Sequence, residues 1–277
     1  MRTEARLLAI AVLLMLLCIS TGCTDTSHKD DLNAARVVIT SDTILSGMIS
    51  SLLPERKYSI EAILPPGQCP GHYDVKLSDI EKLKNAYLVV SFVGMPFMSK
   101  TSASGRFQIL VDAEGRNFMS PDSYVFGLNT IAEKLLRYFP EDSDTIVKRK
   151  RKAIAGINEG AGLIHKRIKK AGISGMTVIA SSMQRQPLEW MGLRVVATYG
   201  RQEAMSAKEI VRLLEVGKSE KVRMVVDNLQ SGPDAGKSIA EGLNVPHVVL
   251  SNFPSEKGYL TTLEENAEAV IKAAMLK

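Results

Sequence analysis

The sequence is poor in cysteine, tryptophan and long apolar runs, and each shortage narrows the kinds of protein that it can encode. Among 277 residues there are only three Cys and one Trp. The 20 Gly and 11 Pro are close to average usage, which excludes collagen-like and low-complexity architectures. With 45% hydrophobic and 23% charged residues, the chain has the composition of a globular protein with a sizeable core.

The positive charge is modest and is concentrated in one place. The formal net charge is +5 and the pI is about 9.0. The one dense basic cluster, residues 148–152, falls in a predicted helix and has no aromatic residues within it. A run of this kind is typical of a solvated helix face, so we expect no nucleic-acid partner.

Motifs of the common enzyme classes are also missing. The sequence has no nucleophile elbow, no zinc-protease helix motif, no phosphate-binding loop and no dinucleotide fingerprint. His28, His165 and His247 fall in a predicted tether, helix and strand, so they assemble no catalytic triad. We therefore expect a binding protein and not an enzyme.

The first residues indicate export. Arg2 and Arg6 precede an uncharged apolar run at residues 7–19. A membrane-crossing helix needs about 20 apolar residues, so this run is too short for a permanent anchor and predicts a signal peptide over residues 1–22.

The end of that segment carries a second signal. Residues 19–23 read Ile-Ser-Thr-Gly-Cys, which resembles the lipobox of bacterial and archaeal lipoproteins. The resemblance implies lipid attachment at Cys23, a polar tether over residues 23–33, and a position on the outer face of the cytoplasmic membrane, periplasmic or extracellular. Once Cys18 is removed with the signal peptide and Cys23 is lipidated, Cys69 is alone and no internal disulfide is expected.

Beyond the tether, β-rich runs alternate with helical stretches. Strands are predicted at residues 36–40, 58–64, 87–92 and 107–112, with helices at 42–53 and 77–86. The alternation resumes with strands at 176–180, 194–198, 222–227 and 247–250, and helices at 207–216, 234–243 and 260–275. Such alternation is typical of α/β proteins with parallel sheets.

A single long helix is predicted between the two halves, over residues 142–171, because apolar residues recur there at helical spacing. The predicted fold is therefore α/β, with two open parallel-sheet lobes, 34–141 and 172–277, joined by one connecting helix. Ligands of such sheets bind at the carboxyl ends of the strands, so we expect a ligand cleft between the lobes.

One predicted loop carries a family resemblance. Residues 65–80 read PPGQCPGHYDVKLSDI, which is similar to the PPG-x-x-P-H-x-Y-E-P-x-P-S-D-I stretch of metal-binding lipoproteins that serve zinc and manganese ABC importers. Asp74 occupies the position of the Glu in that stretch, and Leu77 occupies the position of a Pro. Residues 37–40 and 217–250 are also similar to this family. The resemblance implies that His72 is a metal ligand, as imidazole commonly is for these ions.

The other ligand positions of the family carry different residue types here. The implied metal ligands of this chain are His72, Asp122, Ser182 and Ser251. Tight zinc sites use about four His, Cys or carboxylate donors, so the two Ser leave the set incomplete. Three other residues are candidate substitute ligands, namely Cys69, Met183 and Asp227. Asp122 has an alternative role as a cap of the helix that follows it.

The function expected from the resemblance is capture of a transition metal ion and its delivery to the permease of an ABC importer, by a monomer. Zinc is favoured over manganese because Cys69 is near His72 and carboxylates are few. One alternative is a receptor of the same fold for a metal chelate or another small molecule, held by polar groups of Ser182, Gln184, Ser251 and Asn252. Another is a surface adhesin or scaffold that has lost metal binding.

Lipid anchoring is tested by Cys23→Ala. Because only this side chain supplies the thiol for acylation, the variant should be released from membranes without lipid. Intact-mass analysis of membrane-extracted parent protein should show loss of residues 1–22 and a lipid on Cys23. A parent protein that retains residues 1–22 and carries no lipid contradicts the anchor.

Overall fold

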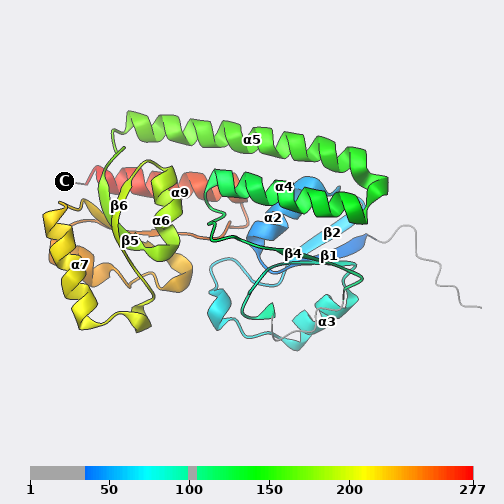
Figure 1. The fold of residues 1–277 in the computed structure, drawn as a ribbon, viewed down its shortest axis with the longest axis horizontal. Coiled ribbons are helices and arrows are strands. Elements are labelled where there is room, and N and C mark those ends of the chain that lie inside the picture. Colours follow the sequence, from blue (N-terminus) through cyan, green and yellow to red (C-terminus); the bar gives the residue numbers. More distant parts are fainter. Residues whose placement is uncertain (1–34, 99–104, 277) are drawn as a thin grey trace, which may run out of the picture. The chain divides into compact units, whose positions relative to one another are not determined.

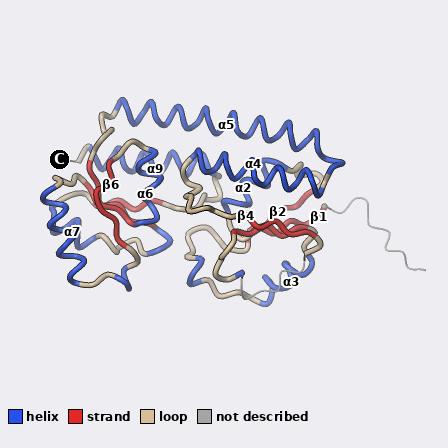
Figure 2. Tube along the Cα trace, viewed as in Figure 1, coloured by secondary structure: helices blue, strands red, loops and turns tan. Residues whose placement is uncertain are grey.

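Two parallel four-stranded sheets form the framework of the protein. The computed structural model describes residues 35–98 and 105–276, and residues from Ala35 onward cluster as one compact unit. The predicted signal peptide, Cys23 and the tether lie outside the described residues. Figure 2 shows the strands in two separate groups, each flanked by helices.

The first sheet has the strand order β2-β1-β3-β4 and the second has the order β6-β5-β7-β8. The strands of the first sheet are β1 (Arg36–Thr40), β2 (Tyr58–Ala62), β3 (Leu88–Phe92) and β4 (Phe107–Val111). Those of the second are β5 (Thr177–Ser181), β6 (Arg194–Tyr199), β7 (Met224–Asn228) and β8 (His247–Leu250). All the pairings within them are parallel, so the predicted fold class is confirmed.

Helices connect the strands and cover the sheets (Figure 1). They are α2 (Thr43–Leu52), α3 (Leu77–Asn85), α4 (Pro121–Tyr138), α5 (Ser143–Lys170), α6 (Arg185–Trp190), α7 (Ala207–Ser219), α8 (Lys237–Leu243) and α9 (Tyr259–Ala274). Sequence reasoning assigned no bounds to α4. The sequence predicted that α8 begins at residue 234, three residues too early. In the structure the Lys237 N–H donates to the Asp234 carbonyl and closes a turn before the helix.

Both faces of each sheet are buried because the strands are apolar on both sides. Successive side chains of a strand point to opposite faces. In β1, Val38 joins the core under the long helices while Ile39 packs on the opposite face with α3 residues. In β7, Val226 joins the core under the long helices, and Val225 packs in a separate core on the opposite face. Such strands are typical of sheets covered on two sides.

The long helix α5 belongs to both halves of the structure. Its buried stripe contains Ile146, Ile157, Ile164 and Ile168, and the helix packs against α2, α4 and α9 (Figure 1). The apolar core beneath it is continuous and includes residues of both sheets. Lys148, Arg151 and Lys152 are exposed, while Arg149 donates to the carbonyls of Ser50 and Ser51 in α2. No helix in the described part of the chain is both long and apolar enough to cross a membrane.

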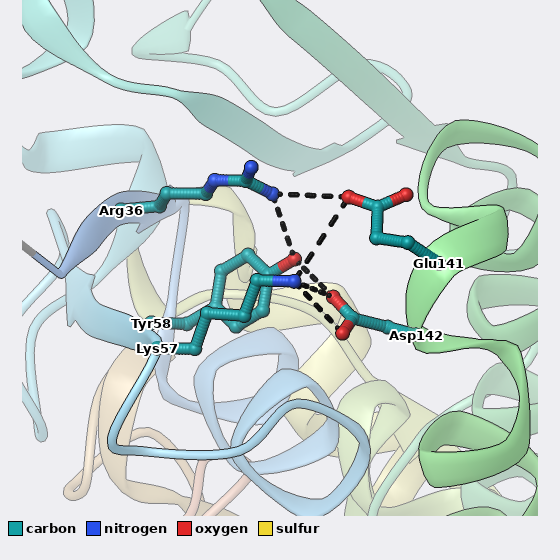
Figure 3. A network of polar contacts seen from close by, with 5 residues as sticks. All are labelled: Arg36, Lys57, Tyr58, Glu141 and Asp142. Carbon is teal, nitrogen blue, oxygen red and sulfur yellow. Dashed lines mark hydrogen bonds and ion pairs between the residues drawn. The ribbon is translucent and has the colours of Figure 1, made fainter. Parts of the chain in front are cut away.

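A polar network fastens the start of α5 to the first sheet (Figure 3). Lys57 Nζ contacts both carboxylate oxygens of Asp142 at 2.8 and 2.7 Å, and the Tyr58 hydroxyl donates to Asp142 at 2.6 Å. Arg36 donates to Glu141 at 3.3 Å and to the Tyr58 oxygen at 3.4 Å. Burial alone would raise the pKa of Asp142, but the hydrogen bonds from Lys57 and Tyr58 and the nearby cations lower it below its usual value.

Asp142→Asn should therefore destabilise the protein in a pH-dependent way. A lowered pKa in the folded state means that the carboxylate stabilises the fold above its unfolded pKa of about 3.9 and loses this effect as the pH falls. We expect a loss of about 1–2 kcal/mol in the free energy of unfolding at pH 7, measured by urea unfolding.

The control is Asp144→Asn, which removes a neighbouring exposed carboxylate. The difference between the two variants should shrink below about pH 4. Equal stability of both variants at pH 7 contradicts the role given to the network.

Candidate functional site

A cavity of about 420 Å³ lies where loops from the carboxyl ends of both sheets meet. The first sheet contributes residues after β4, among them Asn117 and Phe118, and the second contributes Ser182 and Met183 after β5 and Asn252 after β8. The apolar part of the wall is aromatic, with the rings of Phe92 and Phe118 at a centroid distance of 4.9 Å. This is the cleft expected from the strand order.

Asn117 joins the two sides of this cavity. Its side-chain amide donates to the Met183 carbonyl at 2.5 Å and to Asn252 Oδ1 at 2.6 Å. The Asn117 side-chain oxygen accepts the Met119 N–H at 2.8 Å, which fixes the orientation of the amide. The loops after β4, β5 and β8 are therefore held together by one side chain.

Gln186 makes a second bridge, from the start of α6, after β5, to the loop after β4. Its Oε1 accepts the Asn117 N–H at 2.6 Å and its Nε2 donates to the Gly115 carbonyl at 2.8 Å. Sequence reasoning missed both Asn117 and Gln186. The only signal in the sequence was their position after predicted strands.

His72 lies at the end of a short 3₁₀ turn, Pro70–His72, and is exposed. Its backbone N–H donates to the Cys69 carbonyl at 3.1 Å. Arg201, which follows β6 in the other sheet, donates to Cys69 Sγ at 3.3 Å. A Cβ on Gly71 would lie 3.0 Å from the Arg201 guanidinium, so a cation covers the turn that carries His72.

Asp122 occupies the first turn of α4 and is exposed. A carboxylate in this position is stabilised by the positive end of the helix dipole. It is close enough to act on Tyr259, whose pKa is raised first by burial and then by the charges of Tyr124 and Asp122. Asp122 thus contributes negative charge near the start of α9.

Ser182 and Met183 line the cavity from a 3₁₀ turn, Ser182–Gln184. The Met183 side chain is 48% exposed, so its thioether is accessible. Gln184 is fully buried, and its Nε2 donates to Asn228 at 2.9 Å and to the Leu250 carbonyl at 3.3 Å. Gln184 therefore ties the ends of β7 and β8 together and does not line the cavity.

The side chains of Ser251 and Asp227 are held by hydrogen bonds to other residues of the protein. The Ser251 hydroxyl donates to the Phe253 carbonyl at 2.7 Å and accepts from Gln230 at 2.9 Å. Asp227 is fully buried beside α8, where it accepts from the Tyr199 hydroxyl and faces His247 Nε2, both at 2.6 Å. The structure does not bring Asp227 to the cavity.

The described residues contain no group of three or more His, Cys, Asp or Glu side chains placed to hold a metal ion. Of the predicted ligands, Ser182 and Met183 share the cavity wall, while His72, Asp122 and Cys69 are not part of it. Most of the cavity wall is apolar, and its polar side chains are Arg116, Asn117, Ser182, Arg185, Gln186 and Asn252.

Taken together, the two sheets, the single long helix and the cavity at the strand ends define a two-lobed α/β binding protein. Residues 38–273 match the model of the protein family "Zinc-uptake complex component A periplasmic" (ZnuA). The chain belongs to this family. No curated protein sequence matches the chain.

Solved structures share the fold. One titled "Crystal structure of ZnuA" is 16% identical, with a TM-score of 0.71, and the match covers 87% of this chain and 100% of that chain. A Mn-bound periplasmic metal binding protein from Candidatus Liberibacter asiaticus is 14% identical over the same shares, with a TM-score of 0.72. The Cd-bound form of that protein gives 14% identity and a TM-score of 0.72 over the same shares.

The Asn117 bridge is tested by Asn117→Asp. The substitution replaces the NH₂ donor by a carboxylate oxygen. That oxygen would face two acceptors, the Met183 carbonyl and Asn252 Oδ1. We expect the variant to lose about 2–3 kcal/mol in the free energy of unfolding at pH 7, more than Asn117→Ala, because repulsion is added to the lost hydrogen bonds. Part of the loss should return near pH 4, where a protonated carboxyl can donate.

The control for the added charge is Asn158→Asp on the exposed side of α5. Urea unfolding at both pH values measures all three variants. If Asn117→Asp is no less stable than Asn117→Ala and the control, the bridge does not hold the loops.

Proposed function

We propose that the chain is an extracytoplasmic solute-binding lipoprotein that captures a transition metal ion between its lobes and presents it to an ABC importer. Family membership over residues 38–273 carries this proposal. The relatives bound to Mn and Cd support a transition metal as cargo. In this role the protein binds and delivers its cargo as a monomer and performs no catalysis.

His72 is the proposed first ligand because its imidazole is exposed. Asp122 is the proposed carboxylate ligand, and the positions of Ser182 and Ser251 complete the set inherited from the family. Cys69 and Met183 are the proposed substitutes, since sulfur donors favour zinc or cuprous copper over manganese. Recruiting Cys69 requires Arg201 to move from the thiol. Recruiting Ser251 requires its oxygen to give up the hydrogen bond that it accepts from Gln230.

The proposed lobes are residues 34–141 and 172–277, and the proposed connecting helix is 142–171. The core shared beneath α5 opposes wide separation of the lobes. Cargo release is therefore proposed to follow small lobe shifts and loop movement, in which the Asn117 bridge opens.

A second candidate is a metal chelate or another small polar molecule. The observation that favours it is the wall of the 420 Å³ cavity, where Ser182 and Asn252 supply hydrogen-bonding groups and Arg116 and Arg185 supply positive charge. A volume of this size is typical of sites for organic molecules and far exceeds one ion. The chelate keeps most of its own coordination shell, so few protein donors are needed.

The metal proposal is tested with His72→Ala. Titration calorimetry of the purified chain with zinc, manganese and cuprous ions should give binding to the parent, strongest for zinc. The variant should lose binding by orders of magnitude, because the remaining donors cannot complete a coordination shell. The control is His165→Ala. This variant removes an exposed imidazole of α5 that stacks on Trp190 and is not part of the turn at Pro70–His72.

Absence of heat with every ion in the parent protein contradicts capture of a bare ion. The chelate alternative then predicts a rise in Tm when the metal is added with a chelator, and no rise with either alone. Unchanged metal binding in His72→Ala would show that the imidazole is not a ligand.

A further inference from the structure

A second cavity, of about 470 Å³, lies between α2, α5 and the start of α9. It shares no lining residue with the cavity between the strand ends. Its polar lining includes Tyr124, Arg149, Lys152 and Lys257, and none of the lining residues is Asp or Glu. The proposed metal cargo gives this cavity no role.

The Tyr124 hydroxyl faces this space without a partner. Tyr124 is only 2% exposed, and its ring stacks on Tyr259 at a centroid distance of 3.8 Å. Its hydroxyl makes no hydrogen bond to any residue in the described part of the chain. A Cβ built on Gly47 would lie 3.0 Å from the phenolic oxygen, so the hydroxyl packs closely on the Gly47 backbone, and both residues line the cavity. With no partner among the described residues, this donor is available to a ligand.

The start of α9 adds free N–H groups to the same wall. The N-cap is Gly258, at φ +92°, and no side chain caps the helix. The first bond of the helix runs from the Thr262 N–H to the Gly258 carbonyl at 3.2 Å. The N–H groups of Tyr259, Leu260 and Thr261 precede it, and all three residues line the cavity. The positive end of a helix dipole at such groups favours an anion.

Three cations surround this helix end, and two of them face no carboxylate. Arg149 donates to the carbonyls of Ser50 at 2.7 Å and Ser51 at 3.3 Å and forms no ion pair among the described residues. Lys152 forms none either within residues 35–98 and 105–276. Lys257 is paired with Glu265 at 2.9 Å. The side chains that line the cavity therefore carry positive charge and no carboxylate, and they add an unpaired hydroxyl donor and a row of N–H groups. The carboxylate of Asp122, whose charge acts on Tyr259, lies outside this lining.

We propose that this cavity binds a small organic anion. Its oxyanion group, a carboxylate or a phosphate ester, lies between the Tyr124 hydroxyl, the start of α9 and the Lys152 ammonium group. Its apolar body packs on Ala153, Ile157 and Leu260, which form the hydrocarbon part of the wall. The volume fits an organic molecule and is larger than an inorganic ion requires.

The experiment measures the affinity of four probes for the full chain purified in detergent, by titration calorimetry. Benzoate and phenyl phosphate carry both an oxyanion and a ring, inorganic phosphate lacks the ring, and benzyl alcohol lacks the charge. We expect benzoate or phenyl phosphate to bind more tightly than inorganic phosphate and benzyl alcohol.

Two variants and one matched control locate the binding. Tyr124→Phe removes only the hydroxyl and Lys152→Gln removes one charge, and each should weaken binding about tenfold. Lys148→Gln, one helical turn away on α5 and outside the cavity, should change the affinity less than about twofold. Without probe, Tyr124→Phe should keep the Tm of the parent, because the hydroxyl it removes has no partner in the protein.

Three results overturn the proposal. The first is that no probe binds at millimolar concentration. The second is that inorganic phosphate binds as tightly as the two ring-bearing anions. The third is that Lys152→Gln and Lys148→Gln lose the same amount of binding affinity. When Tyr124→Phe has the Tm of the parent, loss of binding in that variant reports on the hydroxyl and not on unfolding.

Discussion

The apolar stripe of α5 is the constraint on which the rest of the structure depends. Ile146 packs near the start of the helix and Ile168 near its end, and the core they join includes residues of both sheets. Each buried Ile contributes roughly 1.5–3 kcal/mol relative to exposure. Separating the lobes would expose this continuous surface, so the two sheets keep one spacing and the loops at their strand ends stay within hydrogen-bonding reach.

That fixed spacing explains how Asn117 and Gln186 can act as bridges. Hydrogen bonds between loops hold only when the elements behind the loops are rigid, since each bond contributes about 1 kcal/mol against the entropy of ordering its partners. The same rigidity brings Arg201 against Cys69. The guanidinium beside the turn that carries His72 must therefore move before a metal ion can use both His72 and Cys69.

The fold was predictable because it rests on local patterns. Strands such as β3 are short runs of mostly apolar residues buried on both faces, and the period of α5 is unambiguous. The site was less predictable because its contacts are long-range. Asn117 and Gln186 are 69 residues apart, and neither belongs to a motif. Asp227 has the right side chain for a ligand, but only the structure shows that Tyr199 and His247 already occupy its carboxylate.

The charges around the inter-lobe cavity bear on what form the cargo takes. Arg116 and Arg185 line the cavity, and their ion pairs with Glu114 and Glu189, at 3.4 and 3.5 Å, join exposed groups that water screens well. No Asp or Glu lines that wall. For the alternative of an anionic chelate these guanidinium groups would supply attraction, whereas a bare divalent ion would need ligands from outside this wall. A chelate in this cavity would contact Ser182, Asn252 and the two guanidinium groups, because the amides of Asn117 and Gln186 are already held in the bridges between the loops.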